Sequence, residues 1–157
     1  MKILNKGEEI VKALVIFDSI LGNTKKIAEA ISNELGKDSR VLSVSDFNSK
    51  DLEGISLIVV GSPIIGWKPS EQMGEFLSNL IEGQLKGIKA AVFDTRIKSF
   101  MSGDALKKIS KELIRAGAEI SVKSHAFYVK GAEGPLFEGE VNKAIEWAKS
   151  IKAIFAD

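Results

Sequence analysis

Short apolar runs alternate along this chain with segments whose apolar residues recur at the helical period, and this alternation limits the folds that the chain can adopt. The runs expected to form strands are 13–17, 40–44, 56–60, 88–93 and a long or interrupted fifth at 119–123 and 126–129. A parallel crossover needs a covering helix and prefers one hand, so strands that alternate with helices predict a parallel sheet covered on both faces. We therefore expect an α/β fold with a doubly wound, five-stranded parallel sheet.

The helices are expected between these strands and after the last one. In each, the residues expected to face the core are mostly three or four positions apart. These residues are Ile27, Ala28, Ile31 and Leu35 in the first helix, Met73, Phe76, Leu77, Leu80 and Ile81 in the second, Leu106, Ile109 and Leu113 in the third, and Val141, Ala144, Ile145, Ala148, Ile151 and Phe155 in the last. Ser70 is the expected cap of the second helix, and Gly36 and Gly117 are expected to end the first and the third.

The composition is that of one globular domain. With 157 residues, 45% of them hydrophobic and 27% charged, the chain can bury a substantial core, so we assign residues 12–157 to one domain that follows a polar lead-in, 1–11. A formal charge of +1 and no long run of Lys or Arg give no reason to expect nucleic acid or a membrane as a partner. Without cysteine and with one histidine, neither a disulfide nor a metal site is expected. No signal-peptide pattern opens the chain, so we expect a cytoplasmic protein.

The loop after the first strand, 18–24, has the composition of a phosphate site. Its hydroxyls, amide side chain and glycine lie where a following helix exposes unpaired backbone N–H groups. The residues expected to bind are Asp18, Ser19, Ile20, Leu21, Gly22, Asn23 and Thr24. The glycine spacing fits neither the dinucleotide fingerprint nor the Gly-Lys-Ser/Thr phosphate loop, so neutral donors would hold the phosphate. The alternative is a capped helix that simply follows a strand.

Two further loops, 62–69 and 94–102, are expected beside the first. In doubly wound sheets, ligands bind beyond the carboxyl ends of the strands, where the strand order reverses. Trp67 could cover a planar ligand next to Gly66, whose backbone can approach a ligand closely, and this pairing suggests a phosphorylated aromatic cofactor. The expected contacts from these loops are Ser62, Pro63, Ile64, Ile65, Gly66, Trp67, Asp94, Thr95, Arg96 and Phe100. Trp67 could instead pack on its own helix, Phe100 could belong to the core or rim, and Asp94-Thr95 could be a turn.

Two stretches resemble the flavodoxin family. They are Asp18-Ser19-Ile20-Leu21-Gly22-Asn23-Thr24 and the stretch 51–63, which ends in Gly61-Ser62-Pro63. The resemblance extends over most of residues 12–155, and the first loop is particularly similar to flavodoxin domains of flavo-diiron proteins. It implies strand order 2-1-3-4-5, with the phosphate of FMN on the first loop and its flavin ring between the second and third loops. Ile20 and Leu21 stand where the family commonly has hydroxyl residues, and the loop after the fourth strand has no tyrosine.

The resemblance also implies a function. It implies an FMN-dependent electron carrier, without a catalytic residue of its own, that serves a reductase and an electron acceptor as redox partners and is a monomer or weak homo-oligomer. Flavodoxins are usually acidic and this chain is not, so docking through a negative surface is not assumed. The segment 127–136 could form a rim that governs access to the ligand, or it could be an ordinary connection.

Three other functions are compatible with parts of the sequence. An FMN-dependent NAD(P)H quinone or nitro-compound reductase would use the same fold, and a domain of this fold without flavin could serve as a scaffold. A phospho-accepting signalling receiver would share the sheet, Asp18 after the first strand and Lys130 after the fifth. The receiver needs an acceptor Asp at the end of the third strand, where this chain has Gly61-Ser62, and this argues against it.

Overall fold

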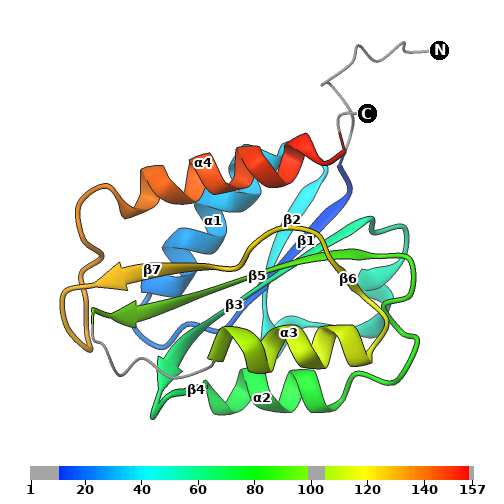
Figure 1. Ribbon diagram of the computed structural model, residues 1–157, viewed down its shortest axis with the longest axis horizontal. Helices are drawn as coiled ribbons and strands as arrows, with labels where there is room; N and C mark the ends of the chain where they lie inside the picture. Colours follow the sequence, from blue (N-terminus) through cyan, green and yellow to red (C-terminus); the bar gives the residue numbers. More distant parts are fainter. Residues whose placement is uncertain (1–10, 99–104, 156–157) are drawn as a thin grey trace.

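The computed structural model describes residues 11–98 and 105–155. Its strands are β1 (Ala13–Phe17), β2 (Ser39–Ser43), β3 (Leu57–Ile65), β4 (Lys68–Pro69), β5 (Lys89–Ile97), β6 (Glu119–Ile120) and β7 (His125–Val129). Its α-helices are α1 (Asn23–Leu35), α2 (Glu71–Ser78), α3 (Ala105–Arg115) and α4 (Glu140–Ala153), and two short 3₁₀ helices, η1 (Val44–Asp46) and η2 (Ser49–Leu52), follow β2. Figure 1 shows how these elements are arranged.

The sheet has the predicted parallel topology. Its strands lie in the order β2-β1-β3-β5-β6, and β7 pairs with the carboxyl-terminal half of β5. Counting β6 and β7 as two halves of an interrupted fifth strand, the order is 2-1-3-4-5, so the predicted fold is confirmed. The short strand β4 is antiparallel to the end of β3 and forms a hairpin with it.

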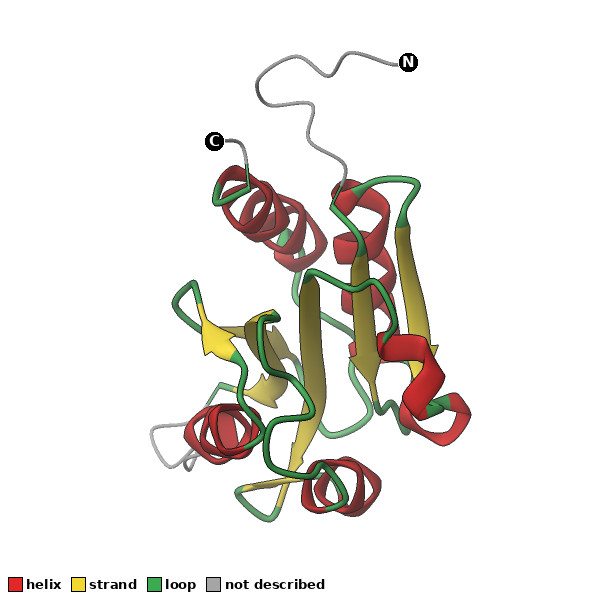
Figure 2. Cartoon of the chain, turned by 90° about the vertical axis from the view of Figure 1, so that its right-hand side faces the viewer, coloured by secondary structure: helices red, strands yellow, loops and turns green. Residues whose placement is uncertain are grey.

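The helices cover both faces of the sheet. Figures 1 and 2 show α1 and α4 together on one face and α2 and α3 on the other. Because β1, β3 and β5 are buried on both faces, their successive side chains enter two separate cores. The core under α1 and α4 contains Phe93, Phe127 and Trp147, and the opposite core contains Met73, Phe76 and Leu113. Val11, the first described residue, is already buried in the first of these cores.

The helical periodicity predicted most of the inward-facing residues, with exceptions near helix ends and at one residue within α4. All four residues predicted to face the core from α1 are buried, and Ser70 caps α2 by accepting a hydrogen bond from the Met73 N–H. Ile81 is exposed because α2 ends at Ser78, so the helical period no longer applies to it. In α4, Val141 is exposed, whereas Trp147, which the periodicity missed, is buried. Leu106, Ile145 and Phe155 are partly buried.

The predicted loops 62–69 and 94–102 are partly strand. Ser62 and Pro63 still pair with Asp94 and Thr95, and β5 pairs with β7 as far as Ile97. The polar residues Ser62, Asp94 and Thr95 were expected in loops because they interrupt the apolar runs. The strands continue through them because their buried side chains find hydrogen-bond partners within the fold.

None of the helices in the described parts of the chain is both long enough and apolar enough to cross a membrane.

Candidate functional site

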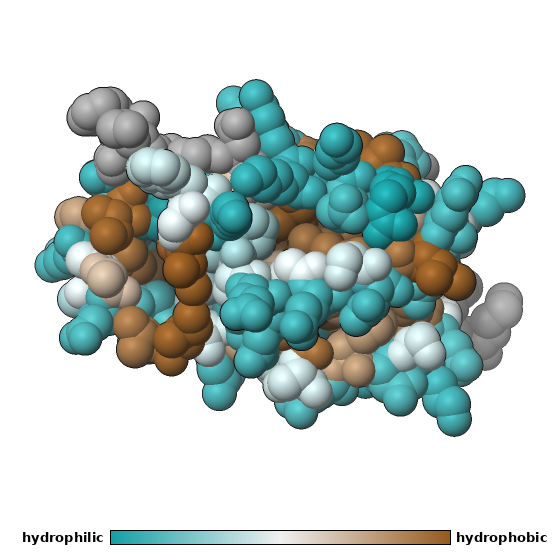
Figure 3. Space-filling view, turned by 90° about the horizontal axis from the view of Figure 1, so that it is seen from below, coloured by the Kyte–Doolittle hydropathy of each residue, from teal (hydrophilic) through white to brown (hydrophobic). Residues whose placement is uncertain are grey.

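A cavity of about 290 Å³ lies at the carboxyl end of the sheet, where the three predicted loops meet. It is lined by Ser19, Ile20, Leu21, Asn23, Thr24, Pro63, Ile64, Ile65, Thr95, Arg96, Ile97, Val129 and Ala132. The first ten belong to the predicted site, and the structure brings them together from three separate segments. The end of the molecule at which β3, β5 and β7 finish carries a concentration of apolar side chains (Figure 3).

The first loop presents backbone donors to this cavity. Gly22, with φ 92°, is the N-cap of α1, and its left-handed conformation turns the chain into the helix. The Ser19 Oγ accepts hydrogen bonds from the N–H groups of Gly22 at 3.0 Å and Lys25 at 3.3 Å. Within the described residues, no protein acceptor takes the N–H groups of Ile20, Leu21, Asn23 and Thr24. Four backbone donors at a helix N-terminus are therefore available to an anion.

Ile20 and Leu21 leave these donors accessible. Both side chains are more than half exposed, so they flank the loop and do not fill it. Neither side chain carries a hydroxyl donor. The backbone therefore supplies most of the donors in this loop.

A buried hydrogen bond joins the first loop to β5. The hydroxyl oxygens of Thr24 and Thr95 lie 2.8 Å apart, and both residues are almost completely buried. The bond connects residues that are 71 positions apart and joins the start of α1 to the carboxyl-terminal half of β5. It gives the cavity a polar base.

Asp94 and Arg96 form an ion pair on β5. The Arg96 Nε donates to Asp94 Oδ1 at 2.9 Å, and its Nη2 donates to Oδ2. Burial raises the pKa of the Asp94 carboxyl above 3.8, an effect that the hydrogen bond from Arg96 opposes; the same hydrogen bond raises the pKa of the guanidinium. The Asp94 side chain is fully buried and only Arg96 lines the cavity, so the pair presents a compensated charge to a ligand.

The turn between β3 and β4 holds the next two predicted residues. Gly66 and Trp67 have φ values of 57° and 66°, which is typical of the two-residue turn that closes a tight hairpin. Trp67 is the one described non-glycine residue with positive φ, a conformation that strains a bulky side chain. Neither residue is among those lining the cavity, and the indole stands largely exposed beside it.

Two other predicted residues have structural partners. The Ser62 Oγ accepts a hydrogen bond from the Ser70 N–H at 2.9 Å, which ties β3 to the start of α2. The Asp18 Oδ1 accepts a hydrogen bond from the Ser19 N–H at 3.0 Å. Neither lines the cavity, and Phe100 lies outside the described residues.

Three cavity residues were not among the predicted contacts. Ile97 and Val129 are partners at the ends of β5 and β7, and Ala132 lies in the connection that follows. The Asn23 amide donates to the Glu133 carbonyl at 3.4 Å, so this connection closes over the first loop. The apolar ends of the two strands were visible in the sequence, but their alignment depends on the pairing of β5 with β7.

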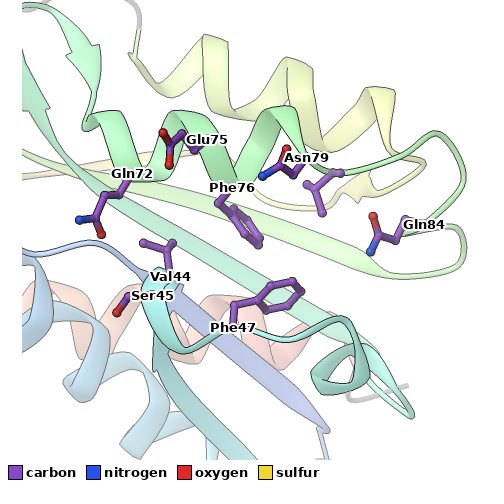
Figure 4. A pocket seen from close by; sticks show the side chains of 9 residues that line it. Val44, Ser45, Phe47, Gln72, Glu75, Phe76, Asn79 and Gln84 are labelled. Atoms are coloured by element: carbon purple, nitrogen blue, oxygen red, sulfur yellow. The ribbon is translucent and has the colours of Figure 1, made fainter.

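A second cavity, of about 410 Å³, lies away from these loops, between α2 and the segment after β2 (Figure 4). The rings of Phe47 and Phe76, which pack edge to face with centroids 4.9 Å apart, lie on its apolar side. The side chains of Gln72, Asn79 and Gln84 lie around it. It is larger than the first cavity, but none of the predicted site residues lines it.

The first cavity suits a phosphorylated aromatic ligand. A phosphate fits the free N–H groups of the first loop, and a flat ring fits the apolar side formed by Ile64, Ile65 and Ile97. At about 290 Å³ the cavity is near the lower end of the ~300–1,000 Å³ typical of ligand pockets, so a tricyclic ring would extend over its apolar rim.

Comparisons with known proteins agree with the fold described above. A flavodoxin from Bacillus cereus (flavodoxin 2) has a TM-score of 0.77 and 23% identity, covering 94% of this chain and 100% of its own. A flavodoxin from the domain Archaea has a TM-score of 0.73 and 23% identity, covering 93% and 99%. Rubredoxin oxygen:oxidoreductase from Desulfovibrio gigas matches with a TM-score of 0.73 and 15% identity over 90% of this chain but 35% of its own. At these identities the structures establish the shared fold alone. The sequence profile described as "Flavodoxin domain" matches residues 14–123, more than half of the chain, and the chain therefore belongs to the flavodoxin family.

Proposed function

We propose that this protein binds FMN in the cavity at the carboxyl end of the sheet and transfers electrons between separate redox proteins in the cytoplasm. Membership of the flavodoxin family, whose members are FMN-binding flavoproteins, confirms the prediction of FMN as cofactor. The assignment of its site, the role as a carrier and the location are our proposals.

The arrangement of the first loop is the observation that carries the proposal. The N–H groups of Ile20, Leu21, Asn23 and Thr24 have no protein acceptor among the described residues, and the start of α1 adds its positive dipole end. We assign the phosphate of FMN to these donors and to the hydroxyl of Ser19. The flavin ring is assigned to the apolar side of the cavity.

Bound FMN supplies one- or two-electron storage, and the protein's part is to bind and shield it. The side chains of Ile64, Ile65 and Ile97 give the cavity an apolar lining against which a flavin ring would be shielded from water. The Asp94–Arg96 pair keeps a donor at the cavity without a net charge. Proton transfer by a side chain is not required, so we assign no catalytic residue.

Titration with FMN and with riboflavin tests the site. Riboflavin has the same ring without the phosphate, so it isolates the contribution of the first loop. We expect FMN to bind with flavin absorption bands in the visible spectrum, and riboflavin to bind at least about tenfold more weakly, a loss of roughly 1.4 kcal/mol or more. Equal affinities would refute the assignment of the loop to phosphate, and a protein that takes up no flavin would support the scaffold alternative.

A turnover assay separates the carrier from the reductase. The FMN-loaded protein is mixed with NADH or NADPH and a quinone, with and without a separate flavodoxin reductase. A carrier turns over only when the reductase is present. Turnover by the protein alone would identify it as an NAD(P)H-dependent enzyme.

A further inference from the structure

The mouth of the cavity is surrounded by large apolar side chains that contact solvent. We call them the mouth patch: Ile20 (62% exposed), Leu21 (55%), Ile65 (48%), Trp67 (57%) and Ile97 (46%). They come from three segments that converge at the carboxyl end of the sheet, where Figure 3 shows apolar atoms gathered. Isolated exposed apolar residues are ordinary, but a cluster around a cavity marks an interaction surface.

The charges next to the mouth patch are predominantly positive. Lys68 and Lys98 follow Trp67 and Ile97 directly in the sequence, and both are exposed. Arg96 also adjoins the patch, but Asp94 compensates its charge. No carboxylate is adjacent in sequence to a patch residue, and Glu133 is adjacent in sequence to Ala132 of the cavity lining.

The lysines at this edge have aromatic contacts in place of acidic partners. The Lys98 Nζ lies 4.6 Å from the centroid of the Phe137 ring, and the Lys130 Nζ lies 6.0 Å from the same centroid. Among the described residues, neither they nor Lys68 form an ion pair, whereas Lys89, Lys143, Lys149 and Lys152 each pair with a glutamate. Their ammonium groups therefore remain available to an external anion.

We propose that the mouth patch docks an acidic redox protein, whose carboxylates meet Lys68, Lys98 and Lys130 while its apolar centre covers the patch. The inference rests on the proposed function, because electron exchange requires the partner to reach the cofactor at this mouth. A symmetric contact with a second copy would bring the same lysines together, which disfavours self-association through this face. A flavodoxin with an acidic surface would instead require a partner with a basic docking surface.

Quenching of the Trp67 fluorescence by ions measures the charge of the mouth patch, and this measurement needs no bound cofactor. The chain has two tryptophans, and Trp147 is 7% exposed, so ionic quenchers reach mainly Trp67. In the protein without FMN, we expect the anion iodide to quench the Trp67 fluorescence more strongly than the cation caesium does. The ratio of the iodide quenching constant to the caesium quenching constant should be at least about twofold higher than the same ratio for free N-acetyltryptophanamide. The Lys68→Glu/Lys98→Glu variant should lower this ratio below that of the free compound.

A matched control carries the same charge change at the opposite end. Lys37 and Lys86 are exposed and precede β2 and β5 at the amino end of the sheet. The Lys37→Glu/Lys86→Glu variant should leave the quenching ratio unchanged. If both double variants change the ratio equally, the effect comes from net charge and the proposed patch is refuted.

Docking is tested with two proteins of opposite charge. Amide NMR spectra are recorded with an acidic plant-type [2Fe–2S] ferredoxin and with basic cytochrome c as probes. We expect ferredoxin to shift signals of residues 65–68, 97 and 98 at low salt, an effect that fades as the Debye length falls to about 8 Å at 0.15 M. Preference for cytochrome c, concentration-dependent dimerisation through the same residues, or binding to anionic vesicles without binding to ferredoxin would overturn the proposal.

The tests of the docking surface do not depend on whether the protein binds FMN. The quenching and NMR experiments use the protein without FMN, and FMN uptake is measured separately by titration. Failure to bind FMN would refute the proposed function and leave the charge of the patch measured. Normal FMN binding with no response to ferredoxin would refute the docking surface alone.

Discussion

Among the described residues, the fully buried carboxylate of Asp94 is paired with Arg96. Replacing Arg96 with alanine leaves that carboxylate without its cation, and breaking a buried pair in this way typically costs about 3–5 kcal/mol. We expect Arg96→Ala to lower the free energy of unfolding by this amount in urea titrations. The Asp94→Asn/Arg96→Ala variant should recover most of the loss, because no buried charge remains. A loss below about 1 kcal/mol for the single variant would contradict the importance of the pair.

The same carboxylate predicts a pH dependence. Burial raises the pKa of Asp94 in the folded protein above its ordinary value of 3.8. The folded state therefore binds this proton more tightly than the unfolded state does, so the stabilising contribution is complete below pH 3.8 and is lost as the pH rises through the folded-state pKa.

Asp94→Asn removes this titration. We expect the free energy of unfolding of the wild type, measured relative to that of Asp94→Asn, to be highest at the acidic end of a urea series and to fall as the pH rises. A difference that grows with pH would show that Arg96 outweighs burial.

At the scale of the elements, β3 and β5 approach closely at Gly61. A Cβ built on Gly61 would overlap the Phe93 ring, which occupies the space that a side chain needs. We expect Gly61→Ala to lower the free energy of unfolding by about 1–3 kcal/mol, the usual cost of overpacking. Gly74→Ala in α2 is the control, because apart from its chain neighbours and the backbone of α2 no atom lies within 4 Å of the added Cβ. It should stabilise the protein by about 0.5–1 kcal/mol.

The β3–β4 hairpin combines strain with a position beside the cavity. Trp67 has a φ of 66°, which asparagine tolerates better than a bulky aromatic residue. We expect Trp67→Asn to raise the free energy of unfolding of the protein without FMN by about 0.5–1 kcal/mol while weakening FMN binding. Urea unfolding and FMN titration measure the two effects. If Trp67→Asn leaves FMN affinity unchanged, the indole has no part in the cofactor site.

At the scale of the whole molecule, the site is assembled from the carboxyl edge of the sheet, so a ligand there should stabilise the entire fold. A ligand that binds the folded state alone adds about 2.7 kcal/mol at a free concentration one hundred times its Kd. We expect thermal unfolding to shift upward with FMN concentration to this extent. An unchanged unfolding temperature at saturating FMN would contradict binding to the native state.

The sequence predicted the fold because its signals are local. The apolar runs and the periodic faces, such as that of α1, report burial residue by residue, and the predicted strand order was confirmed. Predictions failed where a local pattern continued past the end of its element, as at Ile81, or where polar residues remained in paired strands, as at Ser62 and Asp94. Such polar residues are typical of loops in sequence, but their extended conformation follows from pairing with neighbouring strands.

The sequence by itself determined the β-α alternation, the helix N-terminus after β1 and the loops from which the candidate site is built, because each depends on residues adjacent in the chain. Only the tertiary structure decided which residues line the cavity. Thr24 meets Thr95, Ile97 aligns with Val129, and the buried Asp94 pairs with Arg96. These contacts arise from the pairing of strands distant in sequence, which places side chains together that no local pattern relates.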